Sequence, residues 1–258
     1  MNKHTALSPQ DQWKKEAAIA AAAQVTSGMV VGLGTGSTAK FAIDEIGRRV
    51  AEEGLRIIGI ATSERSAEHA QGLKIPLTSF SEHTRIDLTI DGADEVLPGS
   101  LYLIKGHGGA LLREKIVAAA SVRMAVVVDH TKVVKKLGQL VSVPTEVVPF
   151  GWEVTEQRLA KIGGKPKLRL VPDGSPYVTD GGHYILDCAF GAMNDPWSVG
   201  EQLDQIVGVV ENGLFLEYAT EVFVGSSDGV EVLRKTRAAR PKGKATPRPT
   251  TKKKSRRR

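Results

Sequence analysis

The chain has 258 residues, of which 41% are hydrophobic and 25% charged; it is long enough to bury a core, and its composition excludes a fibrous or fully disordered protein. No apolar run reaches the roughly 18 to 20 residues of a membrane span, and the Ala-rich run at 17–23 lacks the apolar core of a signal peptide. The single cysteine, Cys188, excludes an internal disulfide and predicts a reducing, cytoplasmic location.

The net charge of +6 belongs to the end of the chain. Residues 235–258 contain twelve Lys or Arg and no acidic residue, which leaves 23 basic and 29 acidic residues, a net charge of −6, in 1–234. With three prolines and no aromatic residue, 235–258 is predicted to be disordered. It is either a weak, salt-sensitive contact with nucleic acid or another polyanion, or a dispensable solubilising extension.

Helices and apolar strands alternate through the first half of the chain. The predicted strands lie at 29–34, 55–62, 75–80, 85–95 and 123–132, with a further strand entering the glycine run at 102–109. The predicted helices lie at 12–25, 37–54, 64–74 and 110–121. This alternation is typical of a parallel sheet covered on both faces, in which ligands bind outside the carboxyl ends of the strands.

After Gly138 the pattern changes to β-α-β-β-α-β. The strands are predicted at 141–150, 166–171, 183–190 and 207–213, and the helices near 153–162 and 196–206. We therefore expect a small α+β domain over 139–213. A strand and a helical turn within 217–235 are expected to rejoin the first sheet, so that 1–138 and 214–234 form the main domain.

The stretch GLGTGSTA at 32–39 is the first candidate site. Its alternating glycines do not match the dinucleotide pattern G-x-G-x-x-G, and Gly36 is not followed by the lysine of an ATP-binding loop. A glycine turn that enters a helix beside Thr35, Ser37 and Thr38 suits a single phosphate monoester, because amides and hydroxyls meet at the positive end of the helix. Alternatively, Ser37 or Thr38 only caps the helix.

The acidic stretch DGADE follows a predicted strand and contains Asp91, Asp94 and Glu95. Three carboxylates in five residues could hold a magnesium ion or move protons on hydroxyls. They could also form an ordinary solvated turn. No His or Cys lies near enough in sequence to indicate a transition metal.

The stretch KGHGGALLREK at 105–115 combines a cation, glycines and a helical carboxylate. Its three glycines allow backbone amides to approach a ligand, Lys105 adds a positive charge, and Glu114 lies on the following helix. A carboxylate base beside an ammonium and a phosphate anchor indicates proton transfer next to a carbonyl. A lone helical glutamate is more often surface charge, so this interpretation depends on the combination.

These stretches, followed by VVDHTKVVKKLG and a late GSSDGV, closely resemble the ribose 5-phosphate isomerase A family from about Trp13 to Leu233. The resemblance implies a Rossmann-like, mostly parallel α/β domain with a smaller ferredoxin-like α+β domain inserted late in the chain. It implies an isomerase that interconverts ribose 5-phosphate and ribulose 5-phosphate in the pentose phosphate pathway. It further implies independence of metal or other cofactor, and a homodimer or dimer of dimers.

Matching the family's motifs assigns expected roles to residues of this chain. Glu114 is the expected proton acceptor, Asp91 with Asp94 opens the sugar ring, and Lys105 with the loop amides holds the oxyanion of a cis-enediolate. The expected substrate contacts are Thr35, Gly36, Ser37, Thr38, Asp91, Gly92, Ala93, Asp94, Lys105, Gly106, His107, Gly108, Lys132 and Lys14.

One departure and two rivals remain open at this point. Relatives commonly have glycine where this chain has His107, whose side chain could crowd the substrate, donate a hydrogen bond to it or point to solvent. A non-catalytic sugar-phosphate sensor of the same fold is the first rival, and the presence of Glu114 argues against it. An acyl-CoA transferase-like enzyme is the second, but the sequence carries no sign of a coenzyme A site.

Overall fold

The structure is a computed structural model that describes residues 7–236. The disorder predicted for 235–258 falls mainly on 237–258, which lie outside the described residues. Among the helices of 7–236, none combines the length and the apolar character that a membrane crossing requires.

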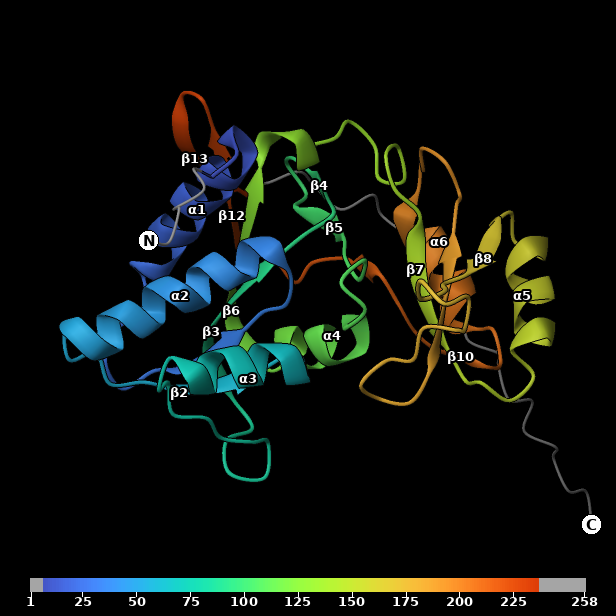
Figure 1. The fold of residues 1–258 in the computed structure, drawn as a ribbon. Coiled ribbons are helices and arrows are strands. Elements are labelled where there is room, and N and C mark those ends of the chain that lie inside the picture. Colours follow the sequence, from blue (N-terminus) through green and yellow to red (C-terminus); the bar gives the residue numbers. More distant parts are fainter. Residues whose placement is uncertain (1–6, 237–258) are drawn as a thin grey trace, which may run out of the picture.

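The main sheet has six strands in the order β13-β12-β6-β3-β1-β2 (Figure 1). Its strands are β1 Val30–Leu33, β2 Ile58–Ala61, β3 Ile86–Gly92, β6 Ser121–Asp129, β12 Glu221–Ser226 and β13 Gly229–Arg234. Neighbouring strands are parallel except for the antiparallel pair of β12 and β13. The helical turn predicted after β12 is therefore wrong. Val230 and Val232 pack against one core of the sheet and Leu233 against the other, which is the two-residue period of a strand.

Helices cover the main sheet and fix its two faces. They are α1 Pro9–Ala22, α2 Ser37–Glu52, α3 Glu64–Gly72 and α4 Leu111–Ala119. Alternate strand residues such as Leu88 and Val127 pack with the alanines of α1 and the apolar face of α2. Met124 and Val126 point to the other side, where they meet Ala118 of α4. This two-sided burial explains why the strands have the near-continuous apolar sequences that indicated a parallel sheet.

Two smaller sheets complete the described chain. A four-stranded antiparallel sheet has the order β10-β7-β9-β8, and Figure 1 shows it beside the main sheet with its two helices. Its elements are β7 Val143–Val147, α5 Trp152–Lys161, β8 Pro166–Leu168, β9 Tyr184–Cys188, α6 Pro196–Asp204 and β10 Val209–Asn212. A three-stranded sheet consists of β4 Glu95–Leu97, β5 Tyr102–Ile104 and β11 Leu214–Phe215.

The predicted α/β class, with a mostly parallel sheet and a smaller α+β unit, is confirmed. The strand predicted at 75–80 is reduced to a single bridge between Gly59 and Leu77. The strands of the four-stranded sheet all fall within 139–213. The division of the chain into 1–138 plus 214–234 and 139–213 stays a prediction.

Candidate active site

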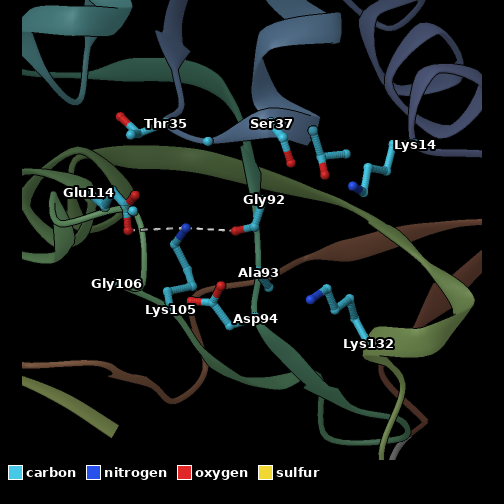
Figure 2. Close-up of a pocket in the computed structure, with 13 residues that line it drawn as sticks. Lys14, Thr35, Ser37, Gly92, Ala93, Asp94, Lys105, Gly106, Glu114 and Lys132 are labelled. Carbon is cyan, nitrogen blue, oxygen red and sulfur yellow. Dashed lines mark hydrogen bonds and ion pairs between the residues drawn. The ribbon is translucent and has the colours of Figure 1, made fainter. Parts of the chain in front are cut away.

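A cavity of about 120 Å³ lies at the carboxyl ends of β1 and β3 (Figure 2). Its lining residues are Lys14, Thr35, Gly36, Ser37, Thr38, Gly92, Ala93, Asp94, Lys105, Gly106, Gly108, Glu114 and Lys132. They come from α1, from the start of α2, from α4, from the ends of β1, β3 and β5 and the loops that follow them, and from the 3₁₀ turn His130–Lys132 that follows β6. The cavity therefore brings together every expected site residue except Asp91 and His107.

One end of the cavity is a helix N-terminus flanked by lysines. Gly36 has φ 111°, a conformation that favours glycine, and it precedes α2 without a side-chain cap for the helix. The capping role considered for Ser37 or Thr38 is therefore absent, and both residues line the cavity. Lys14 and Lys132 lie toward the same end, away from Glu114 (Figure 2). Unpaired amides, hydroxyls and two ammonium groups match the oxygens of a phosphate.

Behind this loop is a hydroxyl cluster that the sequence analysis missed. The Thr35 hydroxyl lies 2.7 Å from that of Thr62, 2.8 Å from that of Ser63 and 3.1 Å from that of Ser66. All four residues are buried, and the Ser66 hydroxyl donates to the Gly34 carbonyl. A polar run directly after the buried strand β2 was the available signal. The Thr35 side chain thus holds the loop in place.

The other end of the cavity contains a buried cluster of charges. The Lys105 ammonium lies 2.9 Å from Asp91 Oδ2 and 3.2 Å from Glu114 Oε2, and it donates to the Gly92 carbonyl at 2.6 Å. The three ionic side chains are at most 2% exposed. Glu114 Oε2 is close enough to Lys105 for an ion pair but accepts no hydrogen bond in the described part of the chain. Among the described residues, the Glu114 side chain is therefore held at the cavity wall by an ion pair alone.

Burial changes the acidity of these groups. Loss of hydration raises the pKa of Glu114 to about 8, although the Lys105 ammonium acts in the opposite direction. Burial also acts to lower the pKa of Lys105, but the carboxylates of Asp91 and Glu114 outweigh it and the pKa rises above its ordinary value. Lys105 is therefore a permanent cation near neutral pH, whereas Glu114 can exchange a proton there.

The three acids of DGADE have separate surroundings. Asp91 is fully buried below the cavity, where its Oδ1 accepts from the amides of Thr35 at 3.0 Å and Gly92 at 2.8 Å. Asp94 lines the cavity. Glu95 is fully buried on β4, and its carboxylate accepts from amides within 138–141.

The solvated turn considered for this stretch is therefore wrong, since two of its three acids are buried. The three carboxylates do not converge either. Within residues 7–236, no group of three or more His, Cys, Asp or Glu side chains is arranged to hold a metal ion.

The His107 side chain is directed out of the cavity. Its Nε2 lies 3.1 Å from the Ser142 carbonyl, and the residue is exposed. Its backbone amide donates to Asp94 Oδ2 at 3.1 Å. The imidazole therefore does not crowd the lining residues, and the residue acts on the cavity through its main chain.

Comparison with known proteins gives a consistent set of relatives. The family model for ribose 5-phosphate isomerase A (phosphoriboisomerase A) matches residues 58–229. The chain is 58% identical over 219 residues to the ribose-5-phosphate isomerase A of Gluconobacter oxydans, covering 84% of this chain and 94% of that protein. It is 51% identical over 230 residues to that of a Synechococcus strain, covering 89% of this chain and 100% of that protein.

Solved structures agree with the sequence matches. Ribose 5-phosphate isomerase A from Methanocaldococcus jannaschii is 40% identical with a TM-score of 0.84, over 87% of this chain and 99% of that one. A D-ribose-5-phosphate isomerase in complex with phospho-erythronic acid is 38% identical with a TM-score of 0.85, over 88% of this chain and 99% of that one.

Proposed function

The chain belongs to the ribose 5-phosphate isomerase A family and interconverts D-ribose 5-phosphate and D-ribulose 5-phosphate, and from this premise we propose how its cavity performs the reaction. The observation that carries the proposal is the buried contact of Glu114 with Lys105 beside a cationic, hydroxyl-rich pocket end. It supplies a base, an oxyanion partner and a phosphate anchor within one cavity.

The substrate phosphate binds at Ser37, Thr38, Lys14 and Lys132. Support comes from the uncapped start of α2 and from the two lysines that line the same cavity. A phosphorylated sugar acid binds a similar structure, which suits a cavity built for a phosphate and an oxygen-rich chain. The sugar carbons then extend toward Lys105 and Glu114, which lie across the cavity from Lys14 and Lys132 (Figure 2).

Ring opening is assigned to Asp94, with Asp91 acting through Lys105. Asp94 lines the cavity, so its carboxylate is the one within reach of the anomeric hydroxyl. It takes the hydroxyl proton and delivers it to the ring oxygen while the bond between C1 and that oxygen breaks, which leaves the open-chain aldehyde. Asp91 lies beneath, paired to the Lys105 ammonium at 2.9 Å. It keeps that cation charged and oriented.

Isomerisation proceeds by proton transfer between neighbouring carbons. Ionised Glu114 removes the proton from C2, the C–H electrons form the C1–C2 double bond, and the carbonyl oxygen becomes the oxyanion of a cis-enediolate. Lys105 stabilises this charge. Glu114 then returns the proton to C1 while the proton of the C2 hydroxyl passes to O1, which yields the ketose. A pKa of about 8 lets one carboxyl group both accept and donate the proton.

Turnover of ribose 5-phosphate in the presence of EDTA tests this assignment. We expect chelator-resistant activity that falls at least about 10³-fold in Glu114→Gln while ligand still binds, because general-base catalysis contributes on this scale. Glu153→Gln, an exposed residue at the start of α5, is the matched control. Activity lost to EDTA would contradict the expected independence of metal, and binding without turnover in the wild type would favour the sugar-phosphate sensor.

The expected homodimer or dimer of dimers is also a proposal. It is supported by an apolar surface formed by Val148, Phe150, Val154 and Val207, where Phe150 is 95% exposed. A backbone bond from Val148 to Gly208 places the end of β7 beside the start of β10. Large exposed apolar patches mark association surfaces. Sedimentation of the wild type and Phe150→Ser tests it, and a monomeric wild type would exclude it.

Two further expectations remain proposals. The basic residues of 235–258 are proposed to make a weak, salt-sensitive contact with a polyanion, which truncation after Thr236 and binding to nucleic acid at two salt concentrations would test. A cytoplasmic location is supported by the single, buried Cys188. Cell fractionation checks that location.

A further inference from the structure

The glycine loop 105–109 is held from outside the cavity by an arginine of the smaller sheet unit. Arg169 follows β8, and its Nη1 donates to the carbonyl of Gly106 at 3.0 Å and to that of His107 at 3.2 Å. Arg169 does not line the cavity. Its contacts therefore act on the loop and not on a ligand.

These two bonds determine where the loop amides point. The described chain contains no cis peptide bond, and in a planar trans peptide the C=O and N–H point in opposite directions. When the Gly106 and His107 carbonyls face Arg169, the amides of His107 and Gly108 face away from it. The His107 amide accordingly donates to Asp94 Oδ2 at 3.1 Å. The same peptide geometry turns the Gly108 amide away from Arg169, and Gly108 lines the cavity.

Arg169 is itself fixed by its surroundings. The Asp187 carboxylate on β9 accepts hydrogen bonds from Arg169 Nε at 2.9 Å and from Nη2 at 2.5 Å, which makes a bidentate pair. The Arg169 side chain is 14% exposed. The guanidinium lies 5.9 Å from the Tyr177 ring centre. The Tyr177 hydroxyl covers Gly109, where a Cβ would come within 2.1 Å of it. The guanidinium is thus in place before any substrate arrives.

From this geometry we infer that Arg169 is a positioning residue of the isomerase, which orients the 106–108 peptides so that their amides and not their carbonyls face the reacting oxygens. Without it, the His107 carbonyl loses its arginine partner and the Gly106 carbonyl keeps only the bond from the Gly109 amide at 3.0 Å, so the peptides can turn and bring a carbonyl dipole toward the cavity, where it would repel the enediolate charge. Asp94 would also lose the amide that holds its carboxylate. The inference rests on the proposed role of this loop in oxyanion stabilisation.

The test compares Arg169→Met with Arg158→Met under saturating and limiting ribose 5-phosphate. Arg158 belongs to the same sheet unit and also donates to a backbone carbonyl, but to that of Val207 at 3.4 Å and not to a carbonyl of the glycine loop. We expect kcat of Arg169→Met to fall about 10²-fold with KM changed less than about threefold, because the phosphate end is intact and a misplaced catalytic group costs on this scale. Arg169→Lys should recover only part of kcat, since one ammonium cannot replace the fork that bridges Asp187 and two carbonyls.

Wild-type kinetics in a folded Arg169→Met would overturn the inference, and so would a loss confined to KM. If Arg169→Met does not fold, Asp187→Asn decides in the same way, with the same kcat loss expected and unchanged kinetics contradicting it. An inactive wild type would instead refute the proposed function. Normal Arg169→Met activity beside an inactive Glu114→Gln would refute only the inference about Arg169.

Discussion

Two ion networks of this chain combine the same kinds of groups in opposite surroundings. On the outer surface of α2, Arg48 lies 2.7 Å from Glu45 and 2.7 Å from Glu53, in contact with water. In the cavity, Lys105 lies 2.9 Å from Asp91 and 3.2 Å from Glu114, and all three are at most 2% exposed. The ion-pair distances are similar in the two networks, but only the network of Arg48 is exposed to solvent.

The two networks shift carboxylate acidity in opposite directions. Hydrogen bonds from Arg48 lower the pKa of both Glu45 and Glu53 below its ordinary value. Burial raises the pKa of Glu114 to about 8 in spite of its cationic neighbour. A salt bridge therefore does not by itself keep a carboxylate acidic, because the loss of hydration can exceed the attraction. In the proposed mechanism this excess gives Glu114 the pKa of a base that works near neutral pH.

The largest effect on stability is expected from Lys105→Met, which removes the cation of the buried network. The buried Asp91 is left without its cationic partner, so the free energy of unfolding should fall by about 3–5 kcal/mol at neutral pH, and turnover by at least about 10²-fold because the oxyanion partner is lost. Urea unfolding and turnover, with the exposed Lys167→Met as control, measure both. An unfolding midpoint equal to that of the control would mean that the network does not depend on Lys105.

The pH dependence of kcat/KM sharpens the same contrast. Glu114 must be ionised to accept a proton, so the rate should rise about tenfold per pH unit from about pH 6.5 and level off near the pKa of about 8. An ordinary exposed glutamate would place this limb near pH 4.5. A rate already level at pH 6 would contradict the raised pKa.

Stability should show the reverse trend with pH. The pKa of Glu114 is raised in the folded state, so the folded chain binds more protons than the unfolded chain between about pH 4.5 and 8. The stability contribution of the protonated carboxyl is complete below this window and declines across it, by at most about 1.4 kcal/mol per pH unit. Unfolding of wild type and Glu114→Gln at several pH values measures the difference, and parallel curves would refute it.

Much of the cavity could be predicted because each of its loops follows a strand: two follow β1 and β3 of the main sheet, and the third follows β5 of the three-stranded antiparallel sheet. The runs 35–38, 91–94 and 105–108 each leave a strand end, and the lining includes residues from all three. The position of Asp91 below the cavity could not be predicted, since its carboxylate accepts from the Thr35 amide, a contact 56 residues away in sequence. A strand was predicted where β5 lies, but its sheet was missed because its partners β4 and β11 have only 3 and 2 residues, too short to reveal a two-residue period.

The contact of Arg169 with the glycine loop was equally hidden. The arginine lies 63 residues after Gly106, in a unit whose sequence indicates only a small antiparallel sheet. No local pattern distinguishes an arginine that binds backbone carbonyls from one on a solvated edge. Position, more than residue type, decides the role here.

The phosphate end of the cavity is intermediate in solvent exposure between the surface network of Arg48 and the buried network of Lys105. Lys132 is half-buried and lines the cavity, so Lys132→Met should raise KM about 10- to 100-fold while kcat stays within a few-fold, because a charge-assisted contact to a bound anion is lost. Lys135→Met, an exposed lysine three residues on, is the control. Equal KM values for the two variants would place the phosphate elsewhere.

The smallest effect is expected from Arg48→Ala, although Arg48 has three carboxylate partners, Glu45, Glu52 and Glu53. Breaking an exposed ion pair costs the protein little stability, because salt and water already screen the charges and water hydrates the groups that remain. We expect the urea midpoint, kcat and KM to stay at wild-type values, and the midpoint to be insensitive to added salt. A loss approaching that of Lys105→Met would show that the number of ionic partners outweighs their burial, and the buried position of Glu114 could then no longer explain its function as a base.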